Sequence, residues 1–110
     1  MIFAFADDST VTAVDDITEA NRFCEVIDVE NGVYTFIDEH AKILRPVLTK
    51  AAKQTVFGLK SSIDTFALVP SKESRPELLQ AVLDGKVSVD PGPRIRTREQ
   101  LLQELDKYKH

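Results

Sequence analysis

The pattern of hydrophobic and polar positions at residues 33–48 predicts the central hairpin of the fold. Residues 33–37, VYTFI, place bulky side chains on both faces of a strand, so other elements must cover both faces. Residues 38–41 are polar and turn-like, which favours a short connection between the two arms. Pro46 cannot donate a hydrogen bond to a neighbouring strand, so the second arm should be a sheet edge or stop pairing near Arg45.

Upstream of this hairpin, the pattern predicts a smaller hairpin and a helix. Residues 2–6 and 10–14 are β-prone runs on either side of a short polar break. Asp16 is followed three residues later by Glu19, which is the spacing of a capping box at a helix start. The apolar residues that should form the buried stripe of this one helix are Ile17, Ala20, Phe23, Cys24 and Ile27.

Downstream, the pattern predicts two more strands, at residues 55–59 and 63–69. The basic segment before them, residues 49–54, fits a loop or a single helical turn. Pro70 should end the second strand, because proline cannot donate to a ladder.

Two helices should complete the chain. Ser74 is placed to cap the first, which should run to Asp84 and stop at Gly85. Thr97 and Gln100 have the spacing of a capping box at the start of the second. The apolar stripes are Leu78, Leu79, Val82 and Leu83 in the first helix and Leu101, Leu102, Leu105 and Tyr108 in the second.

This order of elements predicts a single α+β domain over residues 1–110. We expect a mostly antiparallel sheet of about five to six strands, packed with three helices. The chain has one cysteine, Cys24, which excludes an intrachain disulfide and suits a reducing compartment. The start lacks the basic region of a signal peptide, and no apolar run approaches the ~18 residues of a membrane span. We therefore expect a cytoplasmic protein with no membrane partner.

Charge is unevenly distributed, although the net charge is only −4. Residues 1–40 carry ten carboxylates and one basic residue, Arg22, whereas the remaining 70 residues carry eight carboxylates and 13 basic residues. Two interpretations fit the acidic part: a solvated face, or a surface that meets a basic partner protein. Complementary charge raises association rates toward about 10⁸–10⁹ M⁻¹s⁻¹ at low salt.

No catalytic or metal-binding pattern stands out. Cys24 lies on the expected inward stripe among acidic neighbours, which raise a thiol pKa and favour a core cysteine over a nucleophile. His40 lies in a turn, with no second histidine or cysteine at ligand spacing. His110 is the last residue, and the four glycines are scattered rather than grouped in a phosphate loop. We expect no cofactor, no metal and no enzymatic activity; a small enzyme would need a polar cluster in a pocket.

A second hypothesis is a small nucleic-acid-binding regulator. Arg94, Arg96 and Arg98, together with Lys86, would contact phosphates. The alternation is short, lacks interleaved aromatic residues and lies in a protein of negative net charge. Direct nucleic-acid binding is therefore the less favoured interpretation.

Several segments resemble known proteins: MIFAFADDSTVTAVD, DITEA, IDVENGVYTFIDEHAKIL and DTFALVPSKESRPELLQAVL. They resemble small bacterial proteins encoded beside polymorphic toxins, including immunity proteins of contact-dependent growth inhibition systems. The resemblance implies a non-enzymatic protein that binds the C-terminal domain of a cognate toxin, often a nuclease, and blocks it. Contact residues follow from charge alone, and we expect them to be Asp7, Asp8, Asp15, Asp16, Glu19, Glu25, Asp28, Asp38 and Glu39.

Overall fold

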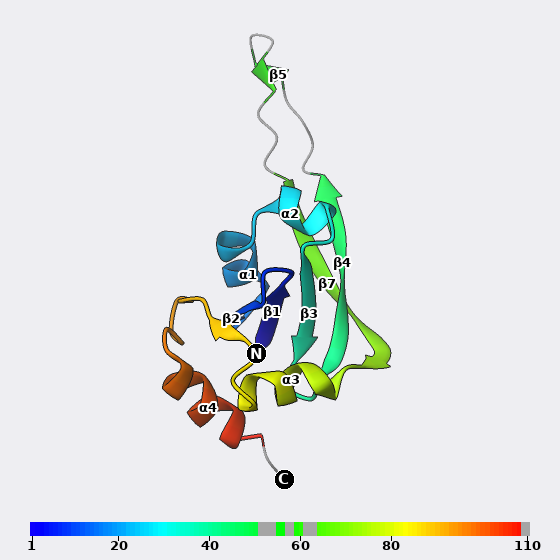
Figure 1. Cartoon of the computed structure of the whole chain (residues 1–110). Coiled ribbons are helices and arrows are strands. Elements are labelled where there is room, and N and C mark those ends of the chain that lie inside the picture. Colours follow the sequence, from blue (N-terminus) through cyan, green and yellow to red (C-terminus); the bar gives the residue numbers. More distant parts are fainter. Residues whose placement is uncertain (51–54, 57–58, 61–63, 109–110) are drawn as a thin grey trace.

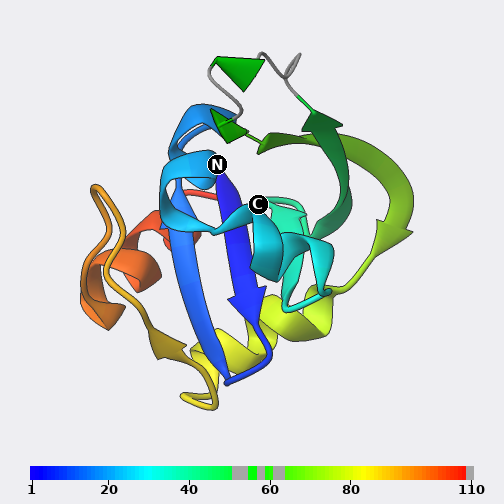
Figure 2. The same cartoon turned by 90° about the horizontal axis from the view of Figure 1, so that it is seen from above.

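The central strand of the fold carries large apolar side chains on both faces, as predicted. The structure, a computed structural model, describes residues 1–50, 55–56, 59–60 and 64–108. Its main sheet has the strand order β7-β4-β3-β1-β2-β8 (Figure 1). These strands are β1 (Ile2–Ala6), β2 (Thr10–Val14), β3 (Tyr34–Asp38), β4 (Lys42–Lys50), β7 (Asp64–Ser74) and β8 (Ser88–Val89). Figure 2 shows β1 and β2 side by side, with β8 beyond β2 and with β4 and β7 on the other side of the sheet.

Helices cover both faces of this sheet. They are α1 (Ile17–Phe23), α2 (Val26–Glu30), α3 (Pro76–Leu83) and α4 (Arg98–Asp106). Ile37 of β3 is 0% exposed and packs into the core that includes Val82 of α3 and Leu101 of α4. Phe36, the preceding residue, is 1% exposed and packs into the opposite core, with Ala20 of α1. The α+β class is confirmed, with a mixed sheet, because β8 pairs parallel with β2.

The expectation of a single helix over residues 17–27 is wrong. The chain breaks at Cys24, which takes an extended conformation (φ −117°, ψ 120°) and separates α1 from α2. The break turns Val29 into the core, and α2 is rich in β-branched residues, which are weak helix formers. Three residues of the expected buried stripe are therefore exposed: Ile17, Phe23 and Ile27.

A side chain of α1 closes the outer edge of β7. The Asn21 Nδ2 donates to the Phe66 carbonyl at 2.9 Å, and the Phe66 N–H donates to Asn21 Oδ1 at 2.9 Å. Asn21 thus makes the two hydrogen bonds that an added strand would make. Open strand edges template association, so this contact protects the sheet.

The same geometry explains both strand prolines. Phe66 directs its N–H and C=O away from β4. The direction of these groups alternates along a strand, so the backbone groups of Leu68 and Pro70, two and four residues later, also point away from β4. Pro46 lies opposite Leu68, so neither proline removes a bond between the two strands. The expectation that Pro70 ends the strand is wrong, since β7 continues to Ser74. Pairing of β4 with β3 does stop before Pro46, but β4 is not a sheet edge.

The first of the two C-terminal helices begins later than predicted. Ser74 pairs with Lys42 as the last residue of β7, and α3 starts at Pro76 with Arg75 at its N-cap and no side-chain cap. The expected cap by Ser74 is therefore wrong, because strand pairing extends through it. Gly85 ends the helix as predicted, with φ +74°.

The segment around Gly92 lies close to β2. At Gly92, a Cβ would lie 2.6 Å from the Ala13 carbonyl oxygen, so only glycine allows this approach.

The second predicted capping box is confirmed: Gln100 N–H donates to Thr97 Oγ1 at 3.2 Å, and Thr97 N–H donates to the Gln100 side chain at 3.2 Å. Tyr108 lies beyond α4 and is exposed, as is Leu83 of α3, so the expectation that both lie on buried stripes is wrong.

The strands expected after β4 are only partly described. β5 (Thr55–Val56) and β6 (Leu59–Lys60) pair as a separate two-stranded sheet. Residues 51–54 of the expected loop, residues 57–58 and 61–63, and His110 lie outside the described residues.

We predict that Asn21→Ala lowers the free energy of unfolding by about 1–2 kcal/mol, because it leaves two backbone groups of Phe66 without partners. The variant should also self-associate as concentration rises, because the β7 edge is open. Urea unfolding and sedimentation velocity measure the two effects. Arg22→Ala, on the same helix, is the matched control; equal effects from both variants would contradict the role of Asn21.

Candidate functional site

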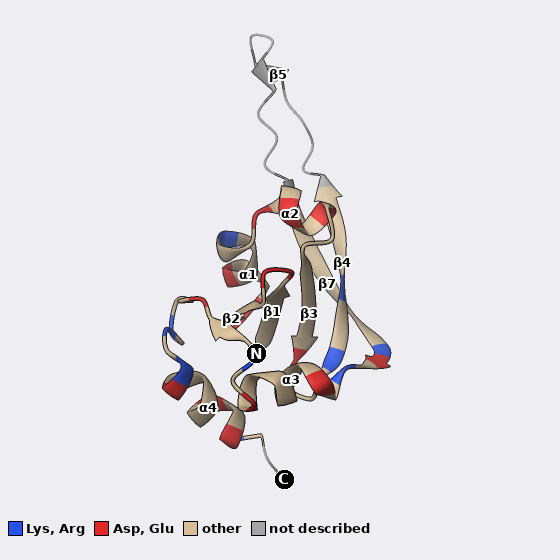
Figure 3. Cartoon of the chain, in the orientation of Figure 1, with Lys and Arg blue, Asp and Glu red and all other residues tan. Residues whose placement is uncertain are grey.

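The nine expected contact residues lie at two ends of the sheet. Tyr34, the first residue of β3, pairs with Ala6 before the β1–β2 turn, and Asp38, its last, pairs with Ile2. Four steps of ~3.3 Å separate these ends by about 13 Å. Figure 3 shows acidic positions on α2 and the β1–β2 turn, and others at the far end of β3. Asp7, Asp8, Glu25 and Asp28 belong to the first end, and Asp15, Asp16, Glu19, Asp38 and Glu39 to the second.

Carboxylates of the second end are used within the fold. Asp16 Oδ1 accepts from the Glu19 N–H at 2.9 Å, and Glu19 Oε1 accepts from the Asp15 N–H at 2.7 Å, which completes a capping arrangement. Asp38 Oδ1 accepts from two N–H groups of the following turn, at 2.8 and 2.9 Å. Glu39 pairs with the N-terminal ammonium at 3.1 Å. The carboxylates of these residues therefore bind groups within the fold.

Asp15 also joins a charge network that fastens the C-terminal part of the chain. Arg94 donates to Asp15 at 2.8 and 3.1 Å and to Glu104 of α4 at 3.0 and 3.3 Å. Lys107 adds a bond to Glu104 at 3.0 Å, and the Glu104 side chain is only 8% exposed. Hydrogen bonds from Arg94 lower the pKa of both Asp15 and Glu104, and the two carboxylates raise the pKa of Arg94.

The first end carries carboxylates that the fold leaves unpaired. Among the described residues, none forms an ion pair with Asp7, Asp8, Glu25, Asp28 or Glu30, and we call these five the acidic end. The turn of Asp7 and Asp8 and the helix α2 flank the start of β3 (Figure 3). Asp8 accepts one hydrogen bond, from the hydroxyl of Thr10.

The negative charge of this end acts on the pKa of a partly buried phenol, that of Tyr34. Burial raises the pKa of Tyr34 to about 12, and Cys24 and the carboxylates of Asp28, Asp90 and Glu25 act in the same direction. Burial likewise raises the pKa of the Cys24 thiol to about 11; Tyr34 opposes this shift, and Asp28 and Asp90 add to it. The thiol is therefore protonated at neutral pH, and Cys24 is a core cysteine rather than a nucleophile.

Two large apolar side chains are exposed beside these carboxylates. Ile27 of α2 is 61% exposed and Phe23, the last residue of α1, is 39% exposed. They alternate along the chain with Glu25 and Asp28. Exposed apolar groups within a charged surround are typical of protein-binding surfaces.

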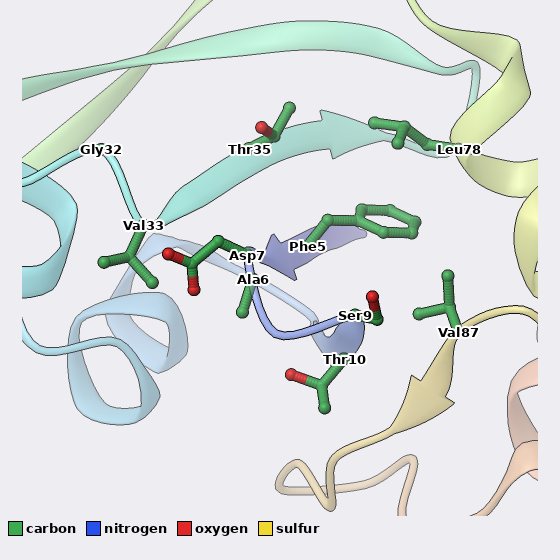
Figure 4. Close-up of a pocket in the computed structure, with 10 residues that line it drawn as sticks. All are labelled: Phe5, Ala6, Asp7, Ser9, Thr10, Gly32, Val33, Thr35, Leu78 and Val87. Carbon is green, nitrogen blue, oxygen red and sulfur yellow. The ribbon is translucent and has the colours of Figure 1, made fainter.

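A cavity of about 260 Å³ opens at the same end of the sheet. Gly32 and Val33, which directly follow α2, line one side of it, together with Asp7. In Figure 4 the Asp7 carboxylate lies beside Val33, and the Phe5 ring extends toward Leu78 of α3. The cavity therefore joins the two segments that carry the acidic end.

The basic segment of the second hypothesis is largely engaged within the molecule. Arg94 is held by Asp15 and Glu104, as described above. Arg98 donates to the carbonyls at the end of α3, Val82 and Leu83, at 3.2 and 3.1 Å. Arg96 and Lys86 are exposed. This arrangement does not favour a phosphate-binding surface.

The described residues contain no group of three or more histidine, cysteine or acidic side chains placed to hold a metal ion. His40 is exposed in the turn after β3. None of the helices described is long and apolar enough to cross a membrane.

Searches against protein-family models, curated protein sequences and solved structures return no match for the chain. A proposal of function therefore depends on the residues of this chain.

Three features of this end were not predicted. Glu30 was counted as acidic but not selected, although it lies on the same short helix as Asp28. Asp90 is far away in sequence, and only the parallel pairing of β8 with β2 brings it near Tyr34. The exposure of Ile27 depends on the break at Cys24. The β-branched residues Val26, Ile27 and Val29 are a sequence signal against a continuous helix here.

We predict that Arg94→Met lowers the free energy of unfolding at pH 7 by about 1–2 kcal/mol, because it leaves the nearly buried Glu104 with Lys107 alone. The folded-state pKa values of Asp15 and Glu104 lie below their ordinary values of 3.8 and 4.5. Their stabilisation is therefore present above those values and lost as the pH falls through the folded-state pKa values.

The difference between the wild type and Arg94→Met should accordingly shrink below about pH 4. Urea unfolding at a series of pH values measures it. Arg96→Met removes a neighbouring exposed arginine and is the matched control. A difference that stayed constant down to pH 2.5 would show that the network does not act through these carboxylates.

Proposed function

We propose that this chain is a cytoplasmic immunity protein of a bacterial toxin system, which binds and neutralises the C-terminal nuclease domain of its toxin. The observation that carries the proposal is the acidic end: five carboxylates that form no ion pair with any described residue, beside the exposed Phe23 and Ile27. A nuclease holds its phosphate backbone with basic side chains, so its substrate cleft is complementary to such a surface.

The apolar and acidic residues have separate roles in this proposal. Phe23 and Ile27 are the anchors, because aromatic and large aliphatic side chains provide most of the binding energy when they become fully buried. Glu25 and Asp28 lie around them and act mainly on the rate of association and on partner choice. A contact of ~800 Å² on each partner is the usual size for a stable complex of this kind.

The way the fold uses its other carboxylates supports this assignment. Asp15, Asp38 and Glu39 each have a partner within the molecule, as shown by the bonds to Arg94, to the β3–β4 turn and to the N-terminus. Those of the acidic end have no ion-pair partner among the residues described, and Asp8 accepts a hydrogen bond from the neighbouring Thr10. The resemblance of several segments to immunity proteins of contact-dependent growth inhibition systems points in the same direction.

The gene next to that of this chain supplies the test partner, and we expect it to encode a secreted toxin with a variable C-terminal domain. Expression of that domain alone should arrest growth, and co-expression of this chain should restore it. Ile27→Ala should weaken binding in calorimetry at least about fivefold, because it truncates an anchor. Leu83→Ala truncates another exposed apolar side chain, on α3, where Leu83 is 39% exposed, and should bind like the wild type. A toxin that this chain does not neutralise would contradict the proposal.

We further predict that the double charge reversal Glu25→Lys and Asp28→Lys slows association with the toxin domain about tenfold at low salt. The rate of the variant should also depend less on salt, because fewer charge pairs are screened. Stopped-flow fluorescence at several salt concentrations measures both effects. Asp106→Lys reverses an exposed carboxylate on α4 and is the control. If this control slowed association to the same extent, net charge rather than the acidic end would govern the rate.

A further inference from the structure

The cavity at the acidic end has two chemically different parts. Phe5, Leu78 and Val87 provide apolar walls. Asp7 provides a carboxylate to which no described residue donates a hydrogen bond. In Figure 4 the Asp7 carboxylate extends toward Val33, whereas the Phe5 ring extends the other way, toward Leu78, so the two parts lie at opposite ends of the cavity. A ligand that fills the cavity must therefore be apolar along its length and positively charged at one end.

The size of the cavity restricts the ligand further. Its volume is about 260 Å³, below the ~300–1,000 Å³ that is usual for cofactor and small-molecule sites. Its mouth is open to solvent, on the same side of the sheet end as the loop after α2. A single long side chain fits these dimensions better than a cofactor does.

We propose that this cavity receives one lysine or arginine side chain of the partner protein. The methylene stem packs against Phe5, Leu78 and Val87, and the cationic head binds the Asp7 carboxylate. This inference rests on the proposed function, because it names the chemistry of the toxin residue that would occupy the site. It adds a specific anchor to a surface otherwise defined by charge.

The hydroxyl groups of the cavity suit the same occupant. Ser9 and Thr35 line it, and their oxygens can accept the N–H groups of a cationic head that Asp7 leaves free. Ser9 adopts φ +65°, a conformation that glycine takes more easily. A serine at this position keeps a hydroxyl at the cavity at some cost in backbone energy.

Other occupants fit less well. An anionic group would meet the Asp7 carboxylate, which repels it. A purely apolar side chain would remove the Asp7 carboxylate from water without giving it a partner, which is unfavourable. A cationic side chain satisfies both parts of the cavity at once.

The experiment titrates the ¹⁵N-labelled full chain with three peptides, acetyl-Gly-Arg-Gly-amide, its lysine counterpart and its norleucine counterpart, and follows the amide resonances. We expect saturable shifts at Asp7, Ser9, Gly32 and Thr35 with the arginine or lysine peptide, and none with the norleucine peptide. Equal binding of the norleucine peptide would show an apolar site and overturn the proposal. Absence of saturable shifts at millimolar concentrations of either cationic peptide would overturn it as well.

Asp7→Asn should weaken binding of the cationic peptide roughly tenfold, because it removes the charge-assisted hydrogen bond. Asp8→Asn, which changes the adjacent carboxylate outside the cavity, should leave it unchanged. Ser9→Gly relieves the positive φ and removes the hydroxyl, so it should fold normally and bind less tightly. If both aspartate variants behaved alike, the cavity would not be the site. Neutralisation of the toxin by the Asp7→Asn chain at full strength would then leave the proposed function standing without this anchor.

Discussion

The fold depends on the need to cover both faces of one strand. Phe36 and Ile37 are neighbours on β3, point in opposite directions and are both fully buried. A chain of 110 residues meets this need with two pairs of short helices, α1 and α2 on one face and α3 and α4 on the other. The carboxylates of residues 1–40 lie at the two ends of this sheet.

The two ends are used in opposite ways. At the end where β2 and β3 finish, the N-terminal ammonium, the cap of α1 and Arg94 each take up a carboxylate. Arg94 is 79 residues from Asp15 in the sequence and binds both Asp15 and Glu104. This end of the sheet is therefore connected to α4. At the other end, no described group forms an ion pair with the carboxylates. The acidic excess of residues 1–40 is thus divided into a structural part and an unpaired part.

Local signals in the sequence were sufficient for the elements that local interactions decide. The hairpin of β1 and β2, the caps at Asp16 and Thr97 and the stop at Gly85 involve groups a few residues apart, so their spacing predicts them. The break at Cys24 was not predictable in this way, because it depends on tertiary packing of Val29. The pairing of Asp15 with Arg94 depends on how the C-terminal segment returns to β2. Which carboxylates remain free follows from such distant contacts, and composition therefore indicated the acidic surface without its location.

Among the described residues, the carboxylates of the acidic end form no ion pair that would stabilise the fold. Glu25, Asp28 and Glu30 lie within six residues, and like charges this close repel each other. Their field acts inward as well, since it adds to the raised pKa of Tyr34. Ile27, in the same segment, exposes apolar surface to water and gains nothing from it in the isolated molecule. Both features become favourable together only when a basic surface with an apolar recess covers them, which is why we assign this end to a protein partner.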